Sequence, residues 1–204
     1  MADSQVVHVI DDDADVRQSL AFLLSTAGLA VRVHDSAVAF LKVLEGVQGG
    51  CVVTDIRMPE IDGLELQRRL HTSGVKLPVI VMTGHGDVAL AVEAMKAGAV
   101  DFIEKPFDDD VLLAAIRTAL SRHAEDSERA TRKAVIQDRL KALSEREREV
   151  LEGLIAGKAN KVIAHDLGIS PRTVEVYRAN VMTKMQADSL SELVRMALVE
   201  GGAL

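Results

Sequence analysis

The sequence predicts two folded domains joined by a helical linker: an α/β domain with a parallel five-stranded sheet, then an all-α domain of four helices. Three observations lead to this fold class. Residues 1–121 alternate short β-branched runs with stretches of helical period. Residues 122–142 are charged, rich in Ala and free of Gly and Pro, as in an exposed helix. Residues 143–204 contain helical segments separated by helix breakers.

Five strand candidates organise the first domain. They are the β-branched runs Val6–Ile10, Val31–Val33, Val52–Thr54, Val79–Met82 and Val100–Ile103. After the first run, apolar residues from Val16 to Ala27 recur at helical spacing, and Ser36 is a suitable N-cap for the next helix. Strands that alternate with helices form a parallel sheet covered on both faces. The flavodoxin-like strand order 2-1-3-4-5 is the natural candidate, with its site at the carboxyl ends of the strands.

The C-terminal domain is expected to contain four helices. They are Ser144–Ala156, Lys161–Leu167, Pro171–Met185 after the N-cap Ser170, and Leu190–Val199, which stops at Gly201-Gly202. The second and third, joined through Gly168, form a helix-turn-helix pattern. The upstream stretch from Asp108 to about Lys141 is compatible with helix throughout.

Composition excludes several classes of protein. Apolar residues make up 48% of the chain, enough for packed cores. The single cysteine, Cys51, rules out a disulfide framework and a cysteine metal site. No apolar stretch reaches the roughly 18–20 residues that span a bilayer. Because no basic region precedes the first apolar run, we expect no signal peptide and a soluble, cytoplasmic protein.

Charge is distributed unevenly along the chain. The whole sequence carries −7, made up of −8 in residues 1–121 (10 Lys/Arg, 18 Asp/Glu), +2 in residues 122–142 (6 and 4) and −1 in residues 143–204 (8 and 9). The acidic total therefore does not exclude nucleic-acid binding by the second domain. An acidic first domain and a near-neutral second domain indicate two different functions.

Acidic and polar side chains follow the predicted strands where a doubly wound sheet would gather them. Asp11, Asp12 and Asp13 follow the first strand, Asp55 the third, Thr83 the fourth and Lys105 the fifth. Crowded carboxylates repel each other, and a hard cation such as Mg²⁺ with oxygen ligands relieves that repulsion. With a lysine nearby, such a pocket favours phosphoryl transfer onto a carboxylate oxygen.

The segments VIDDD, TDIRMPEIDG, MTGHGDV and AGAVDFIEKPF resemble the receiver domain of two-component response regulators over residues 1–121. The resemblance implies that Asp55 is the phosphoacceptor. Mg²⁺ would be bound by Asp12, by Asp11 partly through water, by Asp55 and by the backbone carbonyl of Arg57. Thr83 and Lys105 would contact the phosphoryl group, and the Lys105-Pro106 bond would be cis.

Two features of the first domain need separate interpretation. Phe102 stands where the family often has a rotating aromatic side chain that reports phosphorylation, but a Phe in an apolar strand is equally well explained as core. The six histidines show no metal-ligand spacing and are expected at the surface or in loops.

The third C-terminal helix carries the polar groups of the helix-turn-helix. Arg, Thr, Asn and Lys side chains can contact phosphates or base edges. A helical hairpin with a solvated polar face explains the same pattern. The sequence from Leu143 to Met185 resembles the LuxR/GerE-type DNA-binding domain, in which this helix lies in the major groove. The resemblance implies a set of DNA contacts at Lys161, Arg172, Thr173, Val174, Arg178, Asn180 and Lys184. The last helix could carry dimer contacts or pack on its own domain.

Both domains together resemble the NarL/FixJ family, and most closely its FixJ group. The resemblance implies a transcriptional activator that homodimerises when phosphorylated, with promoter DNA, RNA polymerase and a FixL-like sensor histidine kinase as partners. It also implies control of nitrogen-fixation and microaerobic genes. Regulators of aromatic-compound catabolism share the architecture and are the main alternative. We expect Mg²⁺ but no organic cofactor, and no membrane partner.

Two other classes of function fit parts of the pattern. An aspartate nucleophile with Mg²⁺ also describes haloacid-dehalogenase phosphatases, which carry a second acid two residues after the nucleophile. Here that position is Arg57, so we expect no enzyme activity towards phosphomonoesters. A helix-turn-helix that binds only protein is the second alternative, and a salt-sensitive shift of promoter DNA distinguishes it.

Overall fold

The computed structural model describes residues 5–47, 49–84 and 88–200, with the side chains of Val88, Val199 and Glu200 left aside. The chain divides into two compact units, Met1–Asp126 and Ser127–Leu204.

A parallel five-stranded sheet forms the centre of the first unit. Its strands are β1 (Val6–Ile10), β2 (Ala30–His34), β3 (Cys51–Asp55), β4 (Val79–Thr83) and β5 (Asp101–Glu104). Their spatial order is β2-β1-β3-β4-β5, and every neighbouring pair is parallel. The expected fold and strand order are confirmed, while β5 begins and ends one residue later than the sequence pattern placed it. All residues of β1 and β4 are buried, as expected for strands covered on both faces.

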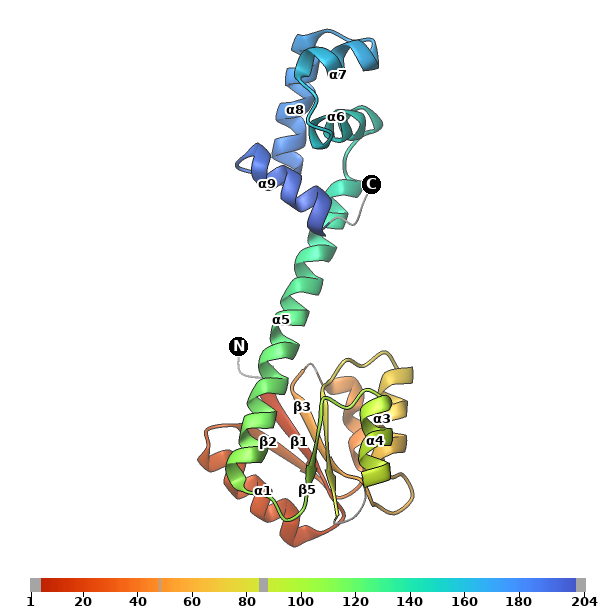
Figure 1. Ribbon diagram of the computed structural model, residues 1–204, viewed down its shortest axis with the longest axis vertical. Helices are drawn as coiled ribbons and strands as arrows, with labels where there is room; N and C mark the ends of the chain where they lie inside the picture. Colours follow the sequence, from red (N-terminus) through yellow and green to blue (C-terminus); the bar gives the residue numbers. More distant parts are fainter. Residues whose placement is uncertain (1–4, 48, 85–87, 201–204) are drawn as a thin grey trace. The chain divides into compact units, whose positions relative to one another are not determined.

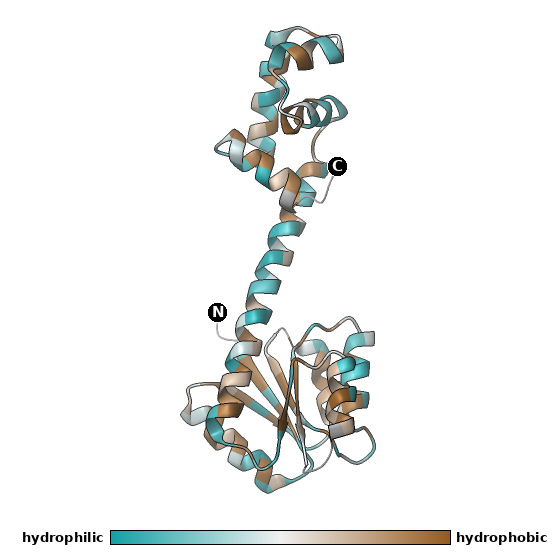
Figure 2. Ribbon diagram, viewed as in Figure 1, coloured by the Kyte–Doolittle hydropathy of each residue, from teal (hydrophilic) through white to brown (hydrophobic). Residues whose placement is uncertain are grey.

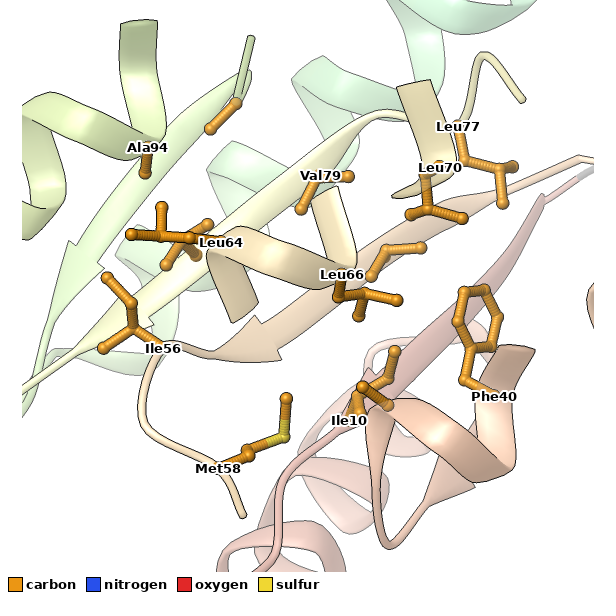
Figure 3. Close-up of a cluster of buried hydrophobic side chains, with 14 residues drawn as sticks. Ile10, Phe40, Ile56, Met58, Leu64, Leu66, Leu70, Leu77, Val79 and Ala94 are labelled. Atoms are coloured by element: carbon orange, nitrogen blue, oxygen red, sulfur yellow. The ribbon is translucent and has the colours of Figure 1, made fainter. Parts of the chain in front are cut away.

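Helices cover both faces of this sheet (Figure 1). Buried side chains of α1 (Ala14–Thr26) and of the first part of α5 (Asp109–Lys141) pack with β-strand residues in one core cluster. Those of α2 (Ala37–Val43), α3 (Gly63–Thr72) and α4 (Val88–Lys96) pack in the other, drawn in Figure 3. A short 3₁₀ turn, Leu44–Gly46, follows α2. Figure 2 shows the strands as hydrophobic ribbon between helices of mixed character.

Side-chain caps fix where these helices begin. The Asp13 carboxylate accepts hydrogen bonds from two backbone amides of the first turn of α1. Ser36 accepts from the backbone N–H of Ala39 at the start of α2, as the sequence predicted. Asp62 accepts from the backbone N–H of Glu65 at the start of α3. Each cap satisfies an amide that has no partner inside its helix.

The second unit is helical. It contains the end of α5, then α6 (Glu145–Ile155), α7 (Asn160–Leu167), α8 (Pro171–Met185) and α9 (Leu190–Arg195), followed by a π-helical turn over Met196–Glu200. The expected stop at Gly201-Gly202 lies outside the described residues. The predicted 122–142 linker lies in α5, one helix of 33 residues, except for Ala142, which follows the helix.

Sequence signals mark the ends of these helices as well. Ser144 and Glu147 form a capping box at the start of α6. Gly168 adopts the left-handed conformation (φ 66°) that ends α7. Ser170 caps α8 with Pro171 at its first position. Their apolar faces meet in one core cluster that includes Val150, Ile163, Val174 and Val181.

No helix in the described parts of the chain is both long enough and apolar enough to cross a membrane.

One expectation about histidines is wrong. His8 lies in the middle of β1 and is only 2% exposed. Its Nδ1 atom is 3.1 Å from Nε2 of His34, and both rings contact Phe40. Strand periodicity places His8 on the same face as Ile10, so it is buried because its strand is central.

Candidate functional site

The acidic pocket (Asp11, Asp12, Asp55, Thr83 and Lys105) lies at the carboxyl edge of the sheet. Asp55 ends β3 and Thr83 ends β4, while Asp11 and Lys105 directly follow β1 and β5. Because β3 lies between β1 and β4, Asp55 is central among them. This is the edge at which doubly wound sheets bind their ligands.

Lys105 joins two of the carboxylates. Its Nζ atom is 2.6 Å from Oδ1 of Asp55 and 3.0 Å from Oδ2 of Asp11. The Asp11 side chain is 2% exposed and that of Asp55 13%. A buried carboxylate needs a partner of opposite charge, so one ammonium compensates two acids that are far apart in the sequence.

The contact with the two carboxylates changes the pKa of Lys105. Burial by itself lowers the pKa of the Lys105 ammonium, but the hydrogen bonds and negative charges of Asp55 and Asp11 outweigh that effect. The net result raises the pKa of Lys105 above its ordinary value. The lysine is therefore a permanent cation at neutral pH, available to a negatively charged group bound beside Asp55.

Backbone groups orient both carboxylates. The Arg57 backbone N–H donates to Oδ2 of Asp55 at 2.7 Å, and the Asp13 backbone N–H donates to Oδ1 of Asp11 at 2.9 Å. Gly63 lies directly under the phosphoacceptor candidate, because a Cβ at that position would be 2.5 Å from the Asp55 carbonyl oxygen. The start of α3 thus packs against the backbone that positions Asp55.

The other candidates around the pocket are placed as follows. Asp12 is exposed, Thr83 is buried, and the Thr83 carbonyl accepts from the Lys105 backbone N–H at 2.8 Å. Phe102 on β5 is 44% exposed, so its interpretation as a plain core residue is wrong. The Lys105-Pro106 peptide bond is cis, as the resemblance implied.

The donor atoms of the pocket suit a hard divalent cation. Mg²⁺ binds one or two protein carboxylates and completes its shell with water and phosphate oxygens. Asp11 and Asp12 are adjacent in sequence, Asp55 is joined to Asp11 through Lys105, and all three offer carboxylate oxygens. Within the described residues no three His, Cys, Asp or Glu side chains already converge on one point. The residues therefore fit an ion that supplements few protein ligands with water and phosphate, rather than a closed protein cage.

The second candidate surface is on α7 and α8. Lys161, Arg172 and Asn180 are exposed, and Thr173 and Arg178 are half-buried. Thr173 is engaged at the N-terminus of α8, where its hydroxyl is 2.8 Å from that of the cap Ser170. The exposed cations and amide lie on the helix-turn-helix that the sequence predicted.

One residue of the expected DNA set is buried, and an exposed neighbour on the same helix was not considered. Val174 is fully buried in the core of the second unit, so it cannot contact a ligand outside that core. Val176 is 55% exposed, and it lies one helical turn from Arg172 and Asn180. Both valines belong to one helix, and only the packing of α8 against α6 and α7 decides which of them faces outward. The helical spacing from Arg172 was the signal that could have identified Val176, rather than Val174, as the valine on the same face as Arg172.

Lys184 has a partner inside its own unit. Its Nζ atom is 2.6 Å from Oε2 of Glu147 and 3.3 Å from the Ala142 carbonyl oxygen. Glu147 is 4% exposed. Hydrogen bonds from Lys184 and Ser144 lower the pKa of the Glu147 carboxyl. The ammonium therefore has a structural task that the sequence pattern did not reveal.

Two protein families match this chain, one on each side of the division after Asp126. Residues 7–117 match the response regulator receiver domain, and residues 141–197 match the bacterial regulatory proteins of the luxR family.

Individual relatives match both parts together. The transcriptional regulatory protein FixJ of Azorhizobium caulinodans is 61% identical over 203 residues, covering 100% of this chain and 96% of the relative. The response regulator protein TodT of Pseudomonas putida is 42% identical and covers 95% of this chain and 85% of the relative. Among solved structures, full-length FixJ from B. japonicum is 58% identical, with a TM-score of 0.62 over 98% of both chains. The response regulator StyR is 40% identical, with a TM-score of 0.86 over 95% of this chain and 98% of that one.

Proposed function

The chain belongs to the NarL/FixJ family of response regulators, is most like FixJ within it, and from that premise we propose that phosphorylation of Asp55 controls DNA binding. The observation that carries the proposal is the acidic pocket. It presents Asp55 at the carboxyl edge of the sheet, with the Lys105 ammonium 2.6 Å away.

The chemistry proposed at this pocket is transfer of one phosphoryl group. An Asp55 carboxylate oxygen attacks phosphorus of the donor, the bond from phosphorus to the donor's leaving atom breaks, and an acyl phosphate forms. Lys105 stays beside the new group and pairs with one of its oxygens. Asp11, Asp12, Asp55 and the Arg57 carbonyl would hold Mg²⁺, which when bound stabilises negative charge on the phosphoryl oxygens.

Phosphorylation gives the pocket a contact that it otherwise lacks. The phosphoryl group carries nearly two negative charges and three acceptor oxygens, in place of the single charge of the Asp55 carboxylate. Thr83, which ends β4, and Lys105, which follows β5, would donate to those oxygens. Such contacts favour one arrangement of the loops after these strands and so shift an existing equilibrium.

We propose that the shift exposes or completes a dimer surface on α4 and β5. Val92 and Met95 on α4 are 48% and 42% exposed, and Phe102 on β5 is 44% exposed. Apolar side chains grouped at a surface support association. A homodimer gives DNA two reading units at high effective concentration, which strengthens binding without any new contact.

DNA binding is proposed for the outer face of α7 and α8. Lys161, Arg172 and Arg178 would contact phosphates or bases, with Thr173 and Asn180 beside them. Val176 replaces Val174 in this set, since an exposed apolar side chain can meet a thymine methyl group. Lys184 joins the set only by leaving Glu147, so we expect its contribution to DNA affinity to be the smallest among the cations.

The physiology follows the resemblance to FixJ. We propose that a FixL-like sensor histidine kinase supplies the phosphoryl group in the cytoplasm, and that the dimer activates RNA polymerase at nitrogen-fixation and microaerobic promoters. Identity of 57–61% to three FixJ proteins, against 42% to TodT, supports this assignment. Control of aromatic-compound catabolism is the alternative within the same architecture.

The proposed phosphoacceptor can be tested by intact-protein mass spectrometry after treatment with acetyl phosphate and Mg²⁺. We expect the chain to gain one phosphoryl group and Asp55→Asn to gain none. Asp110→Asn, which changes an exposed acid at the start of α5, should behave as wild type. Phosphorylation of Asp55→Asn to the wild-type extent would contradict the proposal. Steady turnover of p-nitrophenyl phosphate would favour the phosphatase alternative instead.

A further inference from the structure

A groove lies at the amino edge of the sheet, opposite the acidic pocket. It is bordered by the residues that enter β4 and β5, by the C-terminal ends of α3 and α4, and by α5 up to Asp126. Its volume is about 600 Å³, within the range of small-molecule sites. All of its lining residues belong to the first unit.

One side of the groove is apolar. Leu70, Leu77 and Val79 close it on the side of the core, where they are buried, and Figure 3 shows Leu70 and Leu77 side by side at one end of the core cluster. Ala97, Ala99 and Val100 continue the surface on the chain between α4 and β5. Small side chains there leave room for a flat apolar body.

The rim is charged, and its cations are not paired. Lys76 and Arg122 are exposed, and among the described residues neither forms an ion pair with a protein carboxylate. Asp126 is the single acid of the lining, while His71 and His123 add two imidazole rings. Two fixed cations against one acid give the groove an excess of positive charge, in a unit that is acidic overall.

A polar group in the groove wall also lacks a partner. Gln67 is 3% exposed, and its amide nitrogen donates to the Ala94 carbonyl at 3.2 Å. Its amide oxygen has no hydrogen-bond partner within the described part of the chain. A buried acceptor without a hydrogen bond is unfavourable, so the groove wall has a polar group that the fold itself leaves unsatisfied.

We propose that this groove binds a small amphipathic organic acid. Its apolar body lies on the half-buried side chains of Val75, Ala97 and Val100. Its carboxylate meets Lys76 and Arg122 at the rim. An inorganic anion would leave the apolar side unused, and an organic cation would face two positive charges. The groove borders the segment between α4 and β5, so an occupant contacts the same elements that we propose to respond to phosphorylation.

The probe for this site is 2-naphthoate, titrated into the full ¹⁵N-labelled chain, with the neutral 2-naphthalenemethanol as the matched compound. We expect saturable shifts of backbone amides in the groove lining, and binding of the acid about fivefold to tenfold tighter than binding of the alcohol. The double variant Lys76→Gln/Arg122→Gln should remove that difference. Both side chains are exposed, so the fold should be unaffected.

Lys42→Gln is the control variant, because Lys42 is an exposed lysine on α2 outside the groove. It should bind 2-naphthoate as the wild type does. Equal affinity for acid and alcohol would overturn the assignment to an acid. Absence of saturable shifts in the lining, or shifts confined to other surfaces, would overturn the site itself. Neither result bears on phosphorylation of Asp55, which the mass measurement tests separately.

Discussion

Two lysines of this chain each form polar contacts with two other residues. Lys105 contacts both Asp11 and Asp55 at the proposed phosphorylation site. Lys184 contacts both Glu147 and the Ala142 carbonyl in the second unit. In each case the cation meets a carboxylate that is largely withdrawn from water, where removal of one partner costs more than the pair contributes. The two lysines are therefore the residues at which a change of charge should have the largest local effect.

A double-mutant cycle measures how much the contact between Lys184 and Glu147 stabilises the second unit. We expect Lys184→Met and Glu147→Gln each to lower the free energy of unfolding of the second unit by about 1–2 kcal/mol, because each leaves a group without its charged partner. The double variant should lose less than the sum. Urea denaturation measures the three variants, and strictly additive losses would show that the contact has no energetic role.

The pair His8 and His34 predicts a dependence of stability on pH. Burial, the neighbouring His34 and then Arg32 lower the pKa of His8 from 6.5 to about 4, and burial also lowers the pKa of His34. A histidine whose pKa is lower in the folded state than in the unfolded state makes its full contribution to the free energy of unfolding above pH 6.5. That contribution is lost as the pH falls towards 4, because the unfolded state then binds a proton that the folded state does not. We expect the first unit to lose about 1–3 kcal/mol over this range.

Urea denaturation between pH 4 and 7, followed by circular dichroism, tests this dependence. His8→Val should flatten the profile, since valine suits a buried strand and does not titrate. His71→Gln changes an exposed histidine and should leave the profile as in wild type. A His8→Val profile as steep as that of wild type would assign the acid sensitivity to other groups.

At the scale of elements, the start of α3 is the part of the first unit that holds the acidic pocket in place. Gly63 opens this helix and donates its backbone N–H to the Ile56 carbonyl at 3.1 Å. A side chain there meets backbone atoms of Asp55 and Ile56, which have little freedom to move. Gly63, the last residue of the TDIRMPEIDG segment, is therefore required because a side chain at this position would collide with the backbone of Asp55 and Ile56.

Gly63→Ala should therefore damage the site through the backbone. We expect a loss of stability of about 1–3 kcal/mol from overpacking, and slower phosphoryl uptake from acetyl phosphate because the Asp55 backbone must shift. Gly46→Ala is the control, since a Cβ at Gly46 has no neighbour within 4 Å. Gly63→Ala with wild-type stability and uptake would show that α3 can move away without disturbing the pocket.

Two valines of α8 provide a matched pair for the second unit. Val176→Ala, at a 55% exposed position, should leave stability within about 0.5 kcal/mol and weaken specific DNA binding. Val174→Ala, at a fully buried position, should cost about 1.5–3 kcal/mol of stability and leave the affinity of the folded unit for DNA unchanged. Denaturation and mobility-shift titrations measure both, and the reverse pattern would mean that the reading face of α8 is misassigned.

At the scale of the whole molecule, the architecture was predictable from the sequence because it depends on local signals. Strand runs, helical spacing and caps such as Ser36 and Ser170 each act over a few residues, and the strand order follows from their alternation. The cluster of Asp11, Asp55 and Lys105 was predictable for the same reason, since each residue directly ends or follows a strand.

Other features depend on contacts between distant residues, and the sequence did not reveal them. The partner of Lys184 is 37 positions away, and that of His8 is 26 positions away. The outward side of α8, which favours Val176 over Val174, is decided by packing against two other helices. The groove at the amino edge of the sheet was not predicted either, because it is formed by residues of α3, β4 and α5 and of the two segments that precede β4 and β5.

The central claim is that phosphorylation at Asp55 controls association and DNA binding by the whole chain. It is tested most directly by sedimentation velocity of wild type and Asp55→Asn, with Mg²⁺ and acetyl phosphate, each with and without DNA selected for binding to the chain. We predict that only the wild type dimerises and gains affinity for DNA on treatment. If both proteins dimerise and bind DNA alike, the DNA-binding assignment stands, but the acidic pocket is not the switch.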